Sequence, residues 1–84
     1  MENIFFTSSI KGSPVEVNID PSNFCKAYKV VELRQQGQHF QYLYQDNATG
    51  EFFLAEDSKL TLNDIDPLIP ELNERLTWLD SVGA

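Results

Sequence analysis

Cys25 and His39 are the only cysteine and the only histidine of the 84-residue chain, and together they could form a thiolate–imidazole pair. Nothing near either residue matches the local signature of a thiol enzyme, and one Cys with one His is not a zinc-ligand set. The acids Asp57, Asp64 and Asp66 lack the alternate-residue spacing and the central glycine of a calcium-binding loop. We therefore expect no catalytic residue, no metal and no cofactor, and we predict that the protein is not an enzyme.

Phe40, Tyr42 and Tyr44 alternate along the segment 39–45, so they share one face of a predicted strand. Such a row can be a platform on which the bases of single-stranded nucleic acid stack. Three basic residues of the preceding strand would support that platform: Lys26, Lys29 and Arg34. The simpler interpretation, which we favour, is that the three rings form the core face on which a C-terminal helix packs.

Trp78 is a large aromatic residue outside the apolar stripe of the predicted helix. With Leu72 at the centre of the stripe, a rotation of about 100° per residue places Trp78 about 120° away, beside Glu71. Tryptophan is favoured at the centres of protein interfaces, so this flank is a candidate protein contact. Its residues are Trp78, Glu71, Glu74 and Arg75, and Arg75 is able to pair with Glu71 four positions earlier. The alternative is a ring that lies half buried over the edge of the sheet.

The charge of the chain is unevenly distributed. Thirteen acids outnumber six Lys and Arg residues, which gives a net charge of −7. Residues 1–45 hold four acids and four bases, whereas residues 46–84 hold nine acids against Lys59 and Arg75. The summed field opposes the binding of nucleic acid and of anionic membrane surfaces. It favours a basic protein partner, acidic mimicry of DNA toward a DNA-binding protein, or simply solubility.

The length allows one small domain, residues 1–84, with a thin core. The chain contains no run of about 18 apolar residues, which is the length that a membrane-spanning helix needs. The N-terminal sequence Met-Glu-Asn-Ile-Phe-Phe has an acid where a signal peptide carries basic residues, and a single cysteine cannot close an internal disulfide. We therefore expect a soluble, cytoplasmic protein.

Alternation of apolar and polar residues predicts a β-hairpin over residues 3–19, with its turn at 11–14. A turn at 20–23 precedes a third strand over 26–35, and two further strands follow at 39–45 and 51–55. The last three strands should form an antiparallel meander, because their connections are too short for a parallel crossover. A single helix would cover one side of this sheet. The apolar residues expected on the other side, as a patch for a second copy, are Phe5, Val30, Leu43 and Phe53.

The C-terminal third has a helical period. Its apolar face comprises Ile65, Leu68, Ile69, Leu72, Leu76 and Leu79. Thr61 and Asp64 fit a capping box for a first short turn, and Asp66 before Pro67 is a predicted N-cap. Pro70 is expected to bend or restart the helix. The predicted fold class is therefore α+β: an antiparallel four- to five-stranded sheet, made of a hairpin and a three-stranded meander, packed against one C-terminal amphipathic helix.

These features favour a small, acidic, non-enzymatic protein-interaction module. It would contact a protein partner, or a second copy in a homodimer, through the flank of the C-terminal helix and the uncovered face of the sheet. The alternative is a nucleic-acid-related domain, acting either by aromatic stacking on a strand or by acidic DNA mimicry.

Overall fold

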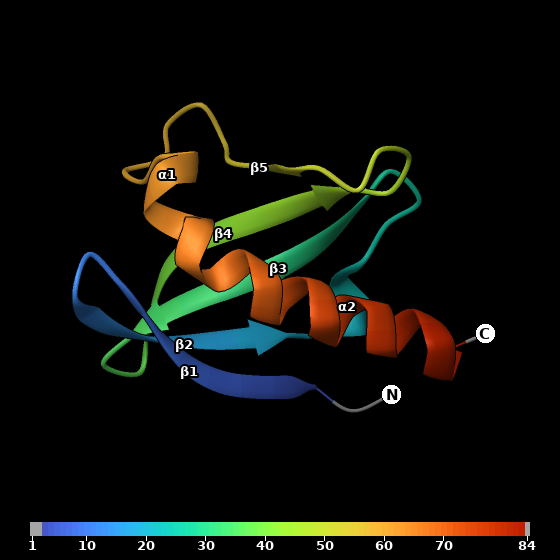
Figure 1. The fold of residues 1–84 in the computed structure, drawn as a ribbon, viewed down its shortest axis with the longest axis horizontal. Coiled ribbons are helices and arrows are strands. Elements are labelled where there is room, and N and C mark those ends of the chain that lie inside the picture. Colours follow the sequence, from blue (N-terminus) through green and yellow to red (C-terminus); the bar gives the residue numbers. More distant parts are fainter. Residues whose placement is uncertain (1–2, 84) are drawn as a thin grey trace.

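The computed structural model describes the backbone of residues 3–83 and the side chains of residues 3–79. Five strands form one open antiparallel sheet whose order follows the chain (Figure 1). Their bounds are Ile4–Ile10 (β1), Ser13–Ile19 (β2), Tyr28–Gln35 (β3), Gln38–Asp46 (β4) and Phe52–Phe53 (β5). Helices cover one side of the sheet, which confirms the predicted α+β fold. Because β2 also pairs with β3, the hairpin and the meander are parts of one continuous sheet.

Two tight turns set the register of the strands. Lys11 and Gly12 join β1 to β2 with φ angles of 53° and 78°, and Gln36 and Gly37 join β3 to β4 with φ angles of 54° and 77°. Two consecutive residues with positive φ are typical of a type I′ turn, whose twist matches that of the strands it joins. Glycine adopts this conformation without steric cost, which explains its place in both turns.

The C-terminal segment folds as a short helix, a 3₁₀ turn (η2) and a longer helix. Their bounds are Leu62–Ile65 (α1), Asp66–Leu68 (η2) and Ile69–Gly83 (α2). The predicted capping box is confirmed: the Asp64 amide donates to Thr61 Oγ1 at 3.3 Å, and the Thr61 amide donates to Asp64 Oδ2 at 2.9 Å. Asp66 is not an N-cap, because its backbone is already right-handed helical. Pro67 and Pro70 lack amide hydrogens, which accounts for the interruption between α1 and α2.

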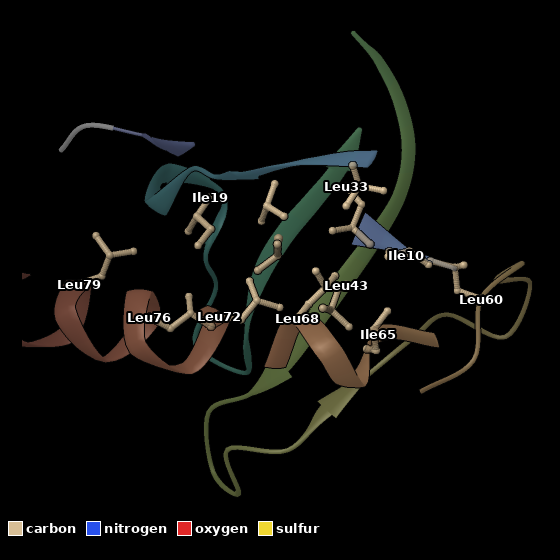
Figure 2. Close-up of a cluster of buried hydrophobic side chains, with 13 residues drawn as sticks. Ile10, Ile19, Leu33, Leu43, Leu60, Ile65, Leu68, Leu72, Leu76 and Leu79 are labelled. Carbon is tan, nitrogen blue, oxygen red and sulfur yellow. The ribbon is translucent and has the colours of Figure 1, made fainter. Parts of the chain in front are cut away.

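The core lies between the helices and one face of the sheet (Figure 2). Its buried apolar residues are Ile10, Val15, Val17, Ile19, Val31, Leu33, Leu43, Leu60, Ile65, Leu68, Leu72, Leu76 and Leu79. The prediction that Leu43 faces away from the helix is therefore wrong. Segment 39–45 carries apolar residues on both faces, so its alternation alone does not determine which set is buried.

The longest described helix, α2, has 15 residues and carries acids along its length, such as Glu71 and Glu74. Within residues 3–83, no helix combines the length and the apolar character that crossing a bilayer requires.

Candidate interaction site on the uncovered sheet face

The side of the sheet away from α2, here called the outer face, is covered by no described element (Figure 1). Its residues follow from the register, because neighbours of buried residues along a strand point the opposite way. Asn18, Glu32 and Tyr42 are cross-strand partners on this face, next to the buried Val17, Val31 and Leu43. The outer face therefore presents whatever side chains it carries directly to solvent or to a partner. Its exposed large residues are Phe5 (62% exposed), Tyr42 (42%), Phe53 (39%) and Tyr28 (36%).

Four aromatic residues from β3, β4 and β5 gather on the outer face and are called the aromatic cluster: Tyr28, Tyr42, Tyr44 and Phe53. Tyr44 is central. Its ring centroid lies 5.3 Å from that of Phe53, in a stacked pair, and 5.2 Å from that of Tyr28, in an edge-to-face pair. The Tyr42 ring lies 6.4 Å from Tyr44. Such pairs are worth about 0.5–1.5 kcal/mol each, so the rings hold one another in place while they remain open to solvent.

The structure corrects the prediction that Phe40, Tyr42 and Tyr44 form one core face. Only Phe40 packs against the core, whereas Tyr42 and Tyr44 lie on the outer face. The cause is a bulge in β4: Leu33 pairs with Gln41 and Arg34 pairs with His39, so Phe40 is an extra residue. A bulge breaks the alternation of the strand, and Phe40 thereby leaves the row of the two tyrosines.

A hollow of about 290 Å³ lies beside the aromatic cluster, between β4 and the segment that follows β5. Tyr42 and Tyr44 line one side, and Ala55, Asp57 and Lys59 line the other. The two charged residues are of opposite sign, so the hollow has little net charge. A concave site bordered on one side by aromatic rings can receive an apolar or aromatic side chain of a partner.

A polar network continues the outer face from Tyr42. His39 Nδ1 lies 2.9 Å from Glu32 Oε2, and Asn18 Nδ2 donates to Glu32 Oε1 at 3.1 Å. The His39 ring also lies against Tyr42, with 4.4 Å between centroids.

Cys25 is exposed, and its backbone amide donates a hydrogen bond to the Tyr28 carbonyl. It lies at the opposite end of the β3–β4 pair from His39. The two residues that could have formed a catalytic pair are thus not brought together.

Several interactions combine to set the pKa of Glu32. Its partial burial raises the pKa, but the hydrogen bonds to Asn18 and His39 and the charges of Arg34 and His39 lower it by more. The pKa of Glu32 therefore lies below its ordinary value of 4.5. A carboxyl group with a lowered folded-state pKa stabilises the protein above its unfolded-state pKa, and this contribution disappears as the pH falls through the folded-state value.

Glu32→Gln should therefore lower the free energy of unfolding at pH 7, and the difference from wild type should shrink as the pH falls below about 4.5. The measurement is urea unfolding of both proteins between neutral and strongly acidic pH. Asp64, whose pKa is also lowered through its bond to the Thr61 backbone, is present in both proteins and does not affect the comparison. A difference that is the same at every pH would show that the charge of Glu32 contributes nothing.

The predicted flank of α2 lies on the other side of the sheet, over β1. Arg75 Nη2 bonds Glu71 Oε1 at 3.1 Å, as predicted, and its guanidinium carbon lies 5.2 Å from the centre of the Phe6 ring. Glu74 is exposed, and Trp78 is 55% exposed. The structure thus brings Glu71, Arg75 and Trp78 together as an open surface, separate from the aromatic cluster. Arg75 also has a structural role, since it covers Phe6.

The three basic residues proposed to support nucleic-acid stacking do not share one surface. Arg34 lies on the outer face, opposite Glu16 and His39. Lys29 pairs with the buried Gln45, so it lies on the helix side, where its Nζ donates to Asn47 Oδ1 at 3.2 Å. Lys26 precedes β3 and is exposed. Of these three bases, only Arg34 shares a face of the sheet with the tyrosines, so the three form no basic row beside the rings.

The aromatic row predicted from the sequence lacks Tyr28 and Phe53, which belong to the aromatic cluster. Phe53 was expected on the uncovered face, and it lies there, as does Val30. Tyr28 falls within the predicted strand over 26–35, for which no aromatic site is predicted. The signal that unites these residues is the pairing of β3, β4 and β5, which places Val30 and Phe53 on either side of Tyr44. No spacing along a single segment reveals it.

Within the described residues, no group of three or more His, Cys, Asp or Glu side chains is placed to hold a metal ion. Comparison of the chain with protein-family models, with curated proteins and with solved structures found no match.

Proposed function

We propose that this protein is a non-enzymatic interaction module that binds a partner protein through the aromatic cluster. One observation carries the proposal. Four aromatic side chains from three strands are packed against one another on a face that no described element covers. Exposed aromatic area of this kind is unfavourable in water unless a partner covers it.

The chemistry of the cluster suits a protein ligand. Tyrosine combines a large rigid ring with a hydroxyl group and loses little conformational entropy on binding, which is why it is frequent in binding surfaces. Tyr42 and Tyr44 also border the hollow that ends at Asp57 and Lys59. An apolar or aromatic residue of the partner would enter this hollow and pack against the tyrosine rings, as in the central part of typical interfaces.

The charges near the cluster support a partner surface that is close to neutral. Glu32 is bonded to His39 and Asn18, and Asp57 lies with Lys59 on the border of the hollow. The acidic excess of residues 46–84 instead includes Asp64, Asp66, Glu71 and Glu74 on the helical segment, across the sheet. A basic partner would be attracted to that side, where it would not cover the aromatic rings.

The exposed thiol of Cys25 supports a cytoplasmic location. It has no disulfide partner in the chain, and a free exposed thiol persists in the reducing cytosol more readily than in an oxidising compartment.

The test begins with capture of binding proteins from lysate of the source cells by wild type, Tyr42→Ala and Phe53→Ala. Phe5→Ala and Trp78→Ala are the matched controls, because each removes an exposed aromatic ring outside the cluster. A specific partner should be lost by both cluster variants and kept by both controls. With the purified partner, each cluster variant should bind about thirtyfold more weakly, as expected for a hot spot of about 2 kcal/mol. A partner that binds all variants equally, or that only Trp78→Ala loses, would contradict the proposal.

Single-stranded DNA at low salt is the probe for the alternative function by stacking. Arg34 is the only one of the three candidate bases on the face of the rings. We therefore expect no binding at DNA concentrations below ~100 μM, which means an affinity weaker than the usual range for non-specific binding. Binding that Tyr42→Ala abolishes would replace the protein partner with nucleic acid.

A further inference from the structure

The two edges of the sheet differ in length and in protection. The edge strand β5 has two residues, and the opposite edge strand, β1, has seven. They form the upper and the lower edge of the sheet in Figure 1. β1 pairs with β2 along its whole length without a shift, and no described strand occupies its other side. Proteins usually block such an edge with a charged residue, a proline or a bulge. β1, whose sequence is Ile-Phe-Phe-Thr-Ser-Ser-Ile, has none of these.

The hairpin turn determines which backbone groups of β1 point outward. In a two-residue type I′ hairpin the flanking residues, here Ile10 and Ser13, form a hydrogen-bonded pair. Hydrogen-bonded and non-hydrogen-bonded pairs alternate, so Ser9 and Pro14 form a non-hydrogen-bonded pair, which suits the missing amide hydrogen of Pro14. By this alternation, three residues of β1 direct their backbone groups away from β2: Phe5, Thr7 and Ser9.

These outward-facing residues are symmetric about the middle of the strand. Thr7 is the central residue of the seven, and Phe5 and Ser9 lie at equal distances on either side. A second, antiparallel β1 pairs all of them when Thr7 meets Thr7 and Phe5 meets Ser9, with about six backbone hydrogen bonds. A shift of the register in either direction leaves some of these groups unpaired.

The exposed flank of α2 lies beside the same edge, because Arg75 lies over Phe6 of β1. The Lys11–Asp64 ion pair of 3.4 Å places α1 at the Ile10 end of β1, so α2 runs from that end toward Phe6. At about 1.5 Å per helical residue and 3.3 Å per strand residue, Glu71 is then level with about Ser8.

The symmetric pairing brings the two helix flanks together. It places Phe6 of one copy opposite Ser8 of the other, so Arg75 of each copy is level with Glu71 of the other. Opposite charges then meet across the axis. Trp78 follows Arg75 by three residues on the same flank, so its exposed ring would be covered.

The distribution of charge favours a second copy at this edge. Residues 1–45, which include β1 and β2, hold four acids and four bases, and β1 itself is uncharged. Pairing of the two uncharged β1 strands therefore brings no like charges together within the sheet, and at the α2 flanks the contacts of Arg75 with Glu71 oppose the repulsion between the acidic helices. Two-fold pairing also covers the β1 edge of both copies at once, so no β1 edge remains to bind a third copy and the assembly stops at a dimer.

We propose that two copies of this protein form a dimer in which their β1 strands pair antiparallel about a two-fold axis at Thr7, with the α2 flanks in contact on one side. The occupant of the edge is a second copy of this chain. The interface is separate from the aromatic cluster, so this dimer and the proposed function can fail independently.

The first test is the concentration dependence of the mass, by light scattering and sedimentation, for wild type, Thr7→Pro and Thr7→Val. Proline removes the outward amide hydrogen of Thr7, which β2 does not use, so the monomer should fold. We expect a wild-type dimer, a Thr7→Pro dimer at least about tenfold weaker, and an unimpaired Thr7→Val dimer. Trp78, the only tryptophan, should shift its emission to longer wavelength when wild type is diluted to monomer.

The second test does not depend on the folding of the proline variant. On a Cys25→Ser background, Thr7→Cys places two thiols on residues whose Cα atoms are about 5.5 Å apart across the axis. The matched control, Ser9→Cys, places them about 14 Å apart, since four residues separate them along the strand. A short thiol cross-linker should join Thr7→Cys chains and not Ser9→Cys chains.

A wild-type protein that is monomeric at every concentration would overturn the proposal. So would a dimer in which the two cysteine variants cross-link equally. A dimer that is lost in Tyr42→Ala and retained in Thr7→Pro would assign the contact to the aromatic cluster instead, and this would also overturn it.

Discussion

Replacing Leu43 by alanine should lower the free energy of unfolding by about 2–5 kcal/mol. The Leu43 side chain is fully buried between the sheet and the helices, so its truncation removes apolar contacts and leaves a cavity. Tyr42→Ala, one residue earlier, should cost only about 0.5–1.5 kcal/mol, because it removes ring contacts from a side chain that is 42% exposed. Urea denaturation followed by circular dichroism measures both values.

The comparison of these two neighbours tests which face of the sheet is the core. If the loss of stability depended only on the volume of the side chain removed, and not on the face of the sheet, Tyr42→Ala would be more destabilising than Leu43→Ala. If Tyr42→Ala were the more destabilising of the two, α2 would pack on the tyrosine side, and the aromatic cluster would be core. The same experiment therefore decides whether the cluster is available to a partner.

The helical part of the fold could be predicted in some detail because its signals are local. The apolar stripe recurs at helical spacing over many residues, and every buried position of α2 as far as Leu79, the last residue whose side chain is described, belongs to it. The Thr61–Asp64 capping box depends on residues three positions apart, and its hydrogen bonds are those that the pattern requires. The predicted N-cap at Asp66 is wrong because a short helix already precedes this residue, and a residue within a helical segment has no free helix N-terminus to cap.

The two faces of the sheet could not be assigned in the same way. In segment 39–45, aromatic residues alternate with Leu43, and both sets are apolar enough for a core. The choice is made by long-range packing: Leu43 pairs with Val31 beneath α2, whereas Tyr44 pairs with Val30 and Phe53 on the other side. The bulge at Phe40 also moves this residue off the face of Tyr42 and Tyr44, and the spacing of residues in the sequence does not predict the bulge.

The same difference between local signals and long-range pairing separates the two candidate surfaces. The flank of Trp78, Glu71, Glu74 and Arg75 lies on a single helix, so a helical projection was sufficient to find it. The aromatic cluster comprises residues of three strands, and the ring of Tyr28 reaches that of Tyr44 only because β3 pairs with β4, where Tyr44 is the partner of Val30. A site assembled from neighbouring strands needs the register, which a single segment does not contain.

The register itself depends on the turns, and Gly37→Val should lower the free energy of unfolding by about 1–3 kcal/mol. Gly37 has a φ of 77°, which a β-branched residue rarely adopts. A Cβ atom at this position would meet no atom within 4 Å other than those of its own residue and its two chain neighbours, so the cost comes from the local backbone conformation and not from packing. Gln38→Val is the matched control: the same side chain is placed one residue later, at the start of β4, where extended backbone suits valine and the change should stay within about 0.5 kcal/mol.

Valine at position 37 would also affect the surface that the hairpin presents. The Gln36–Gly37 turn joins the strands that carry Tyr28, Tyr42 and Tyr44, and a slip of one residue in their pairing would exchange Tyr42 for Leu43 on the outer face. We therefore expect Gly37→Val to weaken the packing of the tyrosine rings, seen as a loss of near-ultraviolet circular dichroism in the fraction that remains folded. Equal unfolding free energies for Gly37→Val and Gln38→Val would show that the left-handed turn does not fix the register, and that the buried contacts of Leu33 and Leu43 are sufficient to do so.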